Sequence, residues 1–236
     1  MDCTHIPEIS CFYSDPIASH ILNPSAHFEY EMILVTDGSA QVQIHDRTYP
    51  LQRGSLLFIS RLEQHQFCIV KEPYCRYVLS VSSDLLLSHL NEPRLASIFM
   101  QRPEYFSHVI QLNEEQLAYF LPFFQKSADE YEKQPDFYSL QSIALLLSIL
   151  ISLYRLYPNA FPMEDSSSLS AAVLNAQIYV SRHFNRKLTL QEIADQCFLN
   201  RHTLSLAFKE IVGTTFKEYL LLFRITEAKK LLLTTD

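Results

Sequence analysis

The segment LTLQEIADQCFLNRHTLSLAFKE, residues 188–210, contains two short helical patterns separated by a few residues that suit a turn. Thr189 and Glu192 have the spacing of a capping box, which predicts that the first helix starts at Leu190. Two short helices joined by a tight turn are the arrangement of a helix-turn-helix. The functional question is whether this unit only packs helices together or places one of them in a DNA groove.

The second helical pattern begins after Asn200, which is a good N-cap residue, and ends near Gly213. Leu204, Phe208 and Ile211 recur at i, i+4 and i+7, so they predict a buried stripe along this helix. The side chains that flank this stripe must then face solvent or a partner.

That outer face carries polar and basic side chains, and we predict that it binds DNA through Arg201, His202, Thr203, Ser205, Leu206 and Lys209. In this orientation Arg201 and Lys209 contact phosphates at the margins, while His202, Ser205 and Leu206 face base edges. The alternative is a helical hairpin whose polar face is only solvated, which is a common arrangement.

The charge of the chain is divided unevenly. The net charge of −7 argues against a protein that coats nucleic acid or membrane with its whole surface. Residues 1–170 carry 10 Lys and Arg against 20 Asp and Glu, whereas residues 171–236 carry 9 against 6. This asymmetry indicates a regulatory or ligand-binding part joined to a part with one basic face that meets an anion such as DNA.

Cysteine usage and the N-terminus predict a cytoplasmic protein without structural disulfides. The five cysteines form an odd set without a CxxC pair, and residues 1–10, MDCTHIPEIS, have neither a basic nor an apolar leader region. Residues 137–154, FYSLQSIALLLSILISLY, are uncharged and reach the lower length limit of a membrane span. Because Ser and Gln interrupt this run, we predict a helix in a core or subunit interface and no membrane partner.

The hydropathy pattern changes along the chain and predicts an α+β protein. Residues 20–82 alternate apolar and polar side chains, with turn signals at Asp37-Gly38 and Arg53-Gly54, so they predict a β-sandwich or barrel. Helical spacing follows over residues 84–157 and resumes from Ala171. We therefore expect a ligand-sensing domain at 1–105, a helical dimerisation segment at 106–160, a linker at 161–170 and an all-α domain at 171–236.

Residues 174–235 resemble the first half of the DNA-binding domain of the AraC/XylS family of transcription regulators. The features that match in order and spacing are LTLQEIA, the run LNRHTLSLAFKE, Gly213 and the Arg-Ile-x-x-Ala-x-x-Leu-Leu pattern that begins at Arg224. The resemblance implies a ligand-responsive DNA-binding regulator with the helix from Arg201 to Lys209 as its recognition helix. No motif fixes a catalytic nucleophile, so neither enzymatic activity nor a cofactor is expected.

Two departures from the family pattern bear on DNA binding. The family commonly has Arg where this chain has Leu206, which offers a base only apolar contact. The resemblance also stops at Asp236, whereas the family pattern continues through a second helix-turn-helix, so an incomplete domain is expected here. One recognition helix makes few contacts, and an isolated unit should bind DNA at roughly 10⁻⁴ to 10⁻⁶ M unless dimerisation adds a second unit.

Residues 20–82 resemble the cupin-like sensor domain, a β-barrel, of many of these regulators. The segment HFEYEMILVTDGSAQVQIHDRTYPLQRGSLLFISRLEQHQF places His27, Glu31 and His65 roughly where metal-binding cupins carry ligands. However, Ser25 stands in place of the first His of the cupin His-x-His pair, and Ser60-Arg61-Leu62 stands in place of Pro-x-Gly.

Such an incomplete set more often lines an organic-ligand pocket than a metal centre. We therefore predict that His27, Glu31, His65 and Tyr77 bind a small-molecule effector and that no metal is bound. The aromatic residues expected to fill the barrel are Tyr30, Phe67, Tyr74 and Tyr77.

A homodimer is expected through residues 137–156. The side chains that form one stripe at helical spacing there are Leu140, Ala144, Leu147, Ile151 and Tyr154. Two other functions remain open. One is a cupin-type metal-dependent enzyme that uses His27, Glu31 and His65, and the other is a regulator deficient in DNA binding that acts by dimerising with a full-length relative.

Overall fold

A computed structural model describes residues 9–14, 27, 29–82, 85–86, 92–103, 105–162 and 168–234. The chain divides into two compact units, one formed by residues 1–99 and 107–161 and the other by residues 100–106 and 162–236. Within the linker predicted at 161–170, residues 163–167 lie outside the described residues, and a helix already begins at Ser168.

The first unit is built on a six-stranded antiparallel sheet in the order β1-β5-β2-β4-β6, and β3 pairs with β2. The strands are β1 (Ile9–Ser14), β2 (Tyr30–Ile44), β3 (Arg47–Gln52), β4 (Ser55–Ile59), β5 (His65–Val81) and β6 (Val109–Gln111). Strand β2 pairs with β5 along its length, with β4 through residues 31–34 and with β3 through residues 39–44. The sheet thus curves over itself, which confirms the predicted cupin-like architecture.

Strand β2 bends at Gly38, and the pairing of β2 with β5 shifts register on both sides of this residue. Gly38 has a φ of +72°, and a Cβ there would lie 2.0 Å from the carbonyl oxygen of Pro73. The turn predicted at Asp37-Gly38 is therefore wrong, because this pair forms a bulge inside β2 and the chain turns at 45–46 instead. The turn predicted at Arg53-Gly54 is confirmed.

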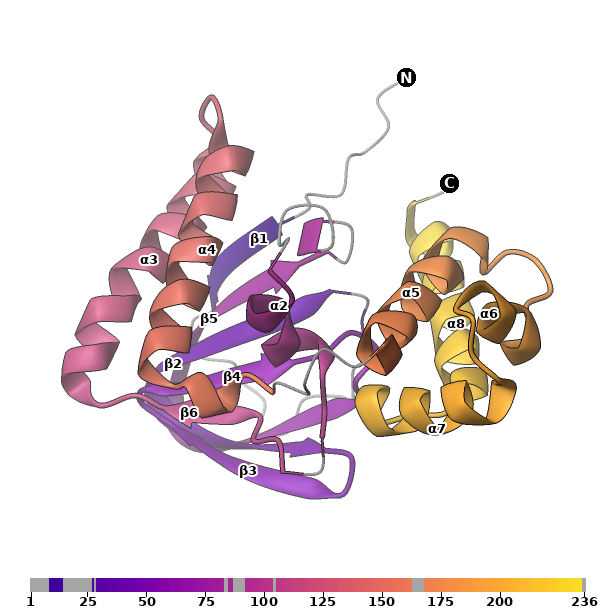
Figure 1. The fold of residues 1–236 in the computed structure, drawn as a ribbon. Helices are drawn as coiled ribbons and strands as arrows, with labels where there is room; N and C mark the ends of the chain where they lie inside the picture. The colour runs from indigo at the N-terminus through magenta and orange to yellow at the C-terminus, as the bar shows by residue number, and fades with distance from the viewer. Residues whose placement is uncertain are drawn as a thin grey trace. The chain divides into compact units, whose positions relative to one another are not determined.

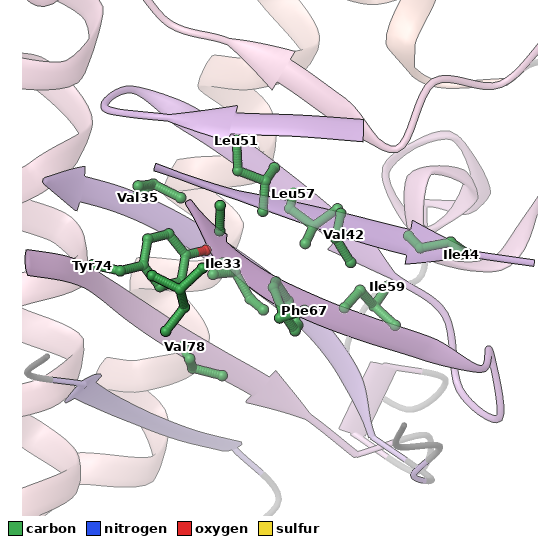
Figure 2. Close-up of a cluster of buried hydrophobic side chains, with 12 residues drawn as sticks. Ile33, Val35, Val42, Ile44, Leu51, Leu57, Ile59, Phe67, Tyr74 and Val78 are labelled. Carbon is green, nitrogen blue, oxygen red and sulfur yellow. The ribbon is translucent and has the colours of Figure 1, made fainter. Parts of the chain in front are cut away.

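Apolar side chains from β2, β3, β4 and β5 form a buried cluster on the inner face of the curved sheet (Figure 2). Phe67 and Tyr74 belong to this cluster, as predicted. Tyr30 does not, because it packs against Phe99 of α2 (Pro93–Met100) with a ring separation of 5.8 Å. The predicted position of Tyr30 in the barrel is thus wrong.

Helices α3 (Glu114–Lys133) and α4 (Tyr138–Leu156) lie side by side and cover the sheet at β1 and β5, and the short 3-10 helix η1 (Pro158–Ala160) follows α4 (Figure 1). Helix α3 begins with a complete capping box between Asn113 and Gln116. Among the described residues, α4 is the one helix whose length and composition would also suit a membrane span. In the structure one of its faces is buried and includes Leu146, Ile149 and Leu153.

The second unit consists mainly of α5 (Ser168–His183), α6 (Leu190–Gln196), α7 (Arg201–Val212) and α8 (Phe216–Thr234) (Figure 1). Helix α7 packs against the other three helices. The Phe208 ring lies at the centre of this packing, with ring centroids 5.7 Å from Phe216 and 5.2 Å from Tyr219. The unit is therefore a small helical domain whose core holds α7 in a fixed orientation.

Candidate DNA-binding helix and sensor site

Side-chain caps fix where α6 begins. The Thr189 hydroxyl accepts a hydrogen bond from the Glu192 backbone N–H at 3.2 Å, so α6 starts at Leu190 as predicted. The Glu192 carboxylate does not complete a capping box with Thr189, because it accepts hydrogen bonds from Tyr179 and Arg186. These bonds join the end of α5 and the loop that follows it to the first turn of α6.

Helix α7 is capped at both ends as the sequence predicts. The Asn200 side-chain oxygen accepts a hydrogen bond from the Thr203 N–H at 2.8 Å. At the other end Gly213 has a φ of +82°, and its N–H donates to the Lys209 carbonyl oxygen at 3.0 Å. The turn before α7 and the turn after it are both determined by local sequence.

The two faces of α7 differ sharply in burial. The buried side chains are Leu204, Ala207, Phe208 and Ile211, which confirms the predicted apolar stripe. The exposed side chains include Arg201, His202, Ser205, Leu206 and Lys209, whereas Thr203 is half-buried. Leu206, at 57% exposure, is a large apolar side chain open to solvent on this face. An exposed helix face with cations at its margins, and with two polar side chains and one apolar side chain between them, suits contact with phosphates and base edges.

Three of the four residues predicted to bind an effector meet in the first unit. One ligand atom from each of His27, Glu31 and His65 lies within 4.8 Å of the others. The His27 Nε2 is 3.3 Å from a Glu31 carboxylate oxygen, and the two imidazole rings are 5.1 Å apart. The Ser80 hydroxyl donates to the other Glu31 oxygen at 3.3 Å. These three residues, called the polar cluster below, stand next to an otherwise apolar core.

Backbone carbonyl groups orient both imidazoles of the polar cluster. The His27 Nδ1 lies 3.0 Å from the Glu29 carbonyl oxygen, and the His65 Nδ1 lies 2.9 Å from the Glu63 carbonyl oxygen. Because a carbonyl only accepts, each Nδ1 carries the proton, and Nε2 is the acceptor nitrogen of each ring when it is neutral.

The charges in the polar cluster follow from burial and from the contact between its members. Burial opposes ionisation of His27 and Glu31, but their mutual contact outweighs it, raising the pKa of His27 above 6.5 and lowering the pKa of Glu31 below 4.5. Burial and the nearby charge of His27 lower the pKa of His65. Two imidazoles and a carboxylate can hydrogen-bond a polar organic ligand, and they are also adequate ligands for Zn, Fe or Mn.

The fourth predicted residue, Tyr77, is not brought to the polar cluster. Tyr77 pairs with Leu34, whereas Ser80 pairs with Glu31, so the period-2 alternation of strands places Tyr77 on the opposite face of the sheet. Its ring packs against Tyr13 of β1 at 4.8 Å and Phe124 of α3 at 6.3 Å. Tyr77 thus lies under helix α3.

A second buried polar group escaped sequence reasoning. The His108 Nε2 lies 2.9 Å from a Glu63 carboxylate oxygen, and its Nδ1 lies 2.9 Å from the Tyr49 hydroxyl. The other Glu63 oxygen accepts from the Ser60 N–H at 2.8 Å. Glu63 stands with His65 roughly where cupins carry their second motif, but no motif links Tyr49 and His108 to it, because the three residues meet only in the folded sheet. Glu63 also holds His65, so this group supports the polar cluster.

A cupin-like domain and a helix-turn-helix in one chain define a DNA-binding transcription regulator with a ligand-binding domain. The profile of the AraC-like ligand binding domain matches residues 7–150, and the profile of bacterial regulatory helix-turn-helix proteins of the AraC family matches residues 180–221. The chain belongs to the AraC family of transcriptional regulators.

Two curated proteins are similar to the chain in sequence, and one solved structure is similar to it in fold. The chain is 26% identical over 214 residues to the uncharacterized HTH-type transcriptional regulator YdeC of Bacillus subtilis, a match that covers 87% of this chain and 71% of YdeC. It is 38% identical over 58 residues to the bifunctional transcriptional activator/DNA repair enzyme AdaA of the same organism, which covers 25% of this chain and 28% of AdaA. The crystal structure of ToxT from Vibrio cholerae bound to an unsaturated fatty acid shares the fold, with a TM-score of 0.61 at 14% identity over 97% of this chain and 81% of ToxT.

Proposed function

We propose that this regulator senses a small organic molecule at the polar cluster and binds DNA through α7, as a homodimer in the cytoplasm and without enzymatic activity. The observation that carries the proposal is the pairing, in one chain, of an exposed cation-bearing helix-turn-helix face with polar side chains at an apolar barrel. ToxT, which shares the fold, has been crystallised with an unsaturated fatty acid, and this supports an organic effector.

On the DNA side, Arg201 and Lys209 contact phosphates, and His202, Ser205 and Leu206 face base edges. The buried positions of Leu204 and Phe208 support this orientation, because they turn the other face of α7 outward. Thr203 belongs to the same proposed DNA-binding set. It is half-buried in the first turn of α7, where its N–H donates to the Asn200 side chain.

The homodimer forms through the outer face of α4, within the helical segment predicted at 106–160. Leu140 is 62% exposed and Ile151 is 38% exposed, and Ala144 lies between them on the same stripe. Leu147 is half-buried, and the Tyr154 ring packs on Phe161 at 5.3 Å. An apolar stripe at helical spacing on an outer helix supports pairing with a second copy by two-fold symmetry. A ligand at the barrel then acts by changing helix packing and so the spacing of two DNA-binding domains.

Two experiments test this function. Selection from a random DNA library should enrich a defined sequence with the wild-type chain, and the Ser205→Ala variant should shift the base preference at one position of it. A thermal-shift screen of sugars, organic acids and aromatics should find compounds that stabilise the wild type, by about 2.7 kcal/mol at a hundredfold excess over Kd.

The Glu31→Ala variant should lose this stabilisation, whereas Glu115→Ala, an exposed carboxylate change on α3, should keep it. Compounds that still stabilise every variant of the polar cluster would show that the effector binds elsewhere. A library that yields no enriched sequence contradicts sequence-specific binding by this chain.

A metal-dependent enzyme is the second candidate, and the close approach of two imidazoles and one carboxylate in the polar cluster favours it. Elemental analysis of the purified protein decides between the two. About one transition metal per chain, lost in Glu31→Ala and His65→Ala, together with turnover of a small acid or sugar, would support the enzyme. A metal content far below one per chain excludes it.

A further inference from the structure

Arg76 is a cation on the inner, apolar face of the sheet. It pairs with Val35 on β2, and its neighbours at the same strand face, Tyr74 and Val78, belong to the apolar cluster. The Arg76 side chain is itself buried, at 8% exposure. Strand alternation in the sequence places Tyr74, Arg76 and Val78 on one face of β5. A cation is not expected among core side chains, so this pattern did not by itself indicate that Arg76 is buried.

The Arg76 guanidinium lies against aromatic rings. Its central carbon is 5.2 Å from the Phe67 ring centroid and 5.0 Å from that of Tyr74. Its Nε and Nη1 are buried and have no hydrogen-bond partner among the residues that the structure describes. The Tyr74 hydroxyl is also buried and makes no well-formed hydrogen bond within the described ranges. Burial has the larger effect on the pKa of Tyr74 and raises it, while the neighbouring Arg76 guanidinium acts to lower it. Two adjacent side chains therefore present unused donors to the inside of the barrel.

Such an arrangement is costly unless an anion completes it. A guanidinium keeps its charge in proteins, and cation–π contacts replace only part of the lost hydration. A buried charge without a partner is among the most destabilising features a core can have. Burial also raises the pKa of Tyr74 to about 12, so its hydroxyl remains protonated and can donate at neutral pH.

We propose that Arg76 and Tyr74 bind the carboxylate of an organic acid inside the barrel, with the apolar body of that acid against Phe67 and the neighbouring core side chains. This inference rests on the proposed ligand-sensing function and names the chemical class of the effector. A carboxylate brings one negative charge to one cation and accepts parallel hydrogen bonds from the guanidinium fork. A phosphate carries about −1.5 to −2 at neutral pH and would bring excess charge into an apolar site.

The position of Arg76 also relates it to the polar cluster. Glu31 and Val35 lie four residues apart on the same face of β2, a rise of about 13 Å along the strand. Since Arg76 pairs with Val35, the carboxylate site and the polar cluster lie on one inner surface of the sheet. A medium-chain acid that carries a polar group at its far end could bind Arg76 with its carboxylate and the polar cluster with its polar group.

The test uses octanoate as the probe, with octanamide as its uncharged counterpart and inorganic phosphate as the other anion. Calorimetric titration of the full chain should detect octanoate binding and not octanamide or phosphate binding. Arg76→Met should weaken octanoate binding roughly ten- to hundredfold, since it removes charge-assisted hydrogen bonds. Tyr74→Phe should weaken it several-fold, whereas Arg47→Gln, an exposed change on β3, should leave it unchanged.

Thermal unfolding separates binding from folding. Without any acid, Arg76→Met should melt at the same temperature as the wild type or higher, because it removes an uncompensated buried charge. Equal octanoate binding by wild type and Arg76→Met, binding of phosphate alone, or no binding of octanoate would each overturn the carboxylate inference. If the last result is accompanied by uncharged hits that Glu31→Ala abolishes, the proposed sensing function stands and only the carboxylate class is wrong.

Discussion

Replacement of Leu206 by Arg should strengthen DNA binding without changing the stability of the fold. Leu206 is 57% exposed on the outer face of α7, so little buried surface is lost, and Arg is a good helix former. The free energy of unfolding should therefore change by no more than about 0.5 kcal/mol. The new cation joins Arg201 and Lys209 on the face proposed to contact DNA.

The size of the gain follows from counterion release. One further phosphate contact should steepen the dependence of log K on log salt by about 0.9, so that raising salt from about 50 to about 200 mM weakens the variant roughly 3.5-fold more than the wild type. If the guanidinium instead reaches a guanine edge, discrimination should improve by about 1–3 kcal/mol. Fluorescence anisotropy on a short duplex across a salt series measures both. An unchanged salt slope and affinity in Leu206→Arg would refute the orientation assigned to α7.

Three further predictions concern the rest of the chain. Leu147→Asp should reduce the mass measured by light scattering from a dimer to a monomer, and an unchanged mass would place the interface elsewhere. Phe208→Ala should cost about 3–5 kcal/mol in chemical denaturation of the helical unit, because it empties a fully buried ring position. Glu31→Gln should lower the melting temperature most between the ordinary pKa values of 4.5 and 6.5. Because the pKa of Glu31 is lowered by folding, its contribution to stability is lost as the pH falls through that pKa. Because the pKa of His27 is raised by folding, its contribution is lost as the pH rises through that pKa. A decrease in melting temperature that does not vary with pH would contradict the ion pair.

The helical unit was the more predictable part of the molecule. Its boundaries depend on residues that act within a few positions of themselves, namely Thr189, Asn200 and Gly213. All three cap their helices, although Glu192 does not complete the capping box with Thr189. The buried stripe of α7 follows from the repeat of apolar residues every three to four positions, which any helix that packs on one face requires. Such local features can be predicted from sequence because each capping residue interacts with residues close to it in the chain.

The sheet was less predictable because its contacts join distant segments. Asp37-Gly38 suits both a turn and a bulge, since both require a residue that tolerates positive φ, and only pairing with β5 selects the bulge. The side of the sheet that Tyr77 faces depends on the register with β2, which the sequence does not state. The aromatic neighbours of Arg76 and the hydrogen-bond partners of His108 likewise depend on how the strands curve together, so the sequence did not indicate them.

The most direct test of the account compares two double variants that remove the same charge. Arg201→Ala/Lys209→Ala removes two cations from the outer face of α7, and Arg47→Ala/Arg94→Ala removes two exposed cations from the sensor unit. In anisotropy titrations on a duplex, the α7 pair should lose at least tenfold in affinity and about 1.8 in the salt slope, while the control pair should keep both close to wild type. Equal affinity and slope in both double variants would contradict the claim that α7 is the DNA-binding element of this regulator.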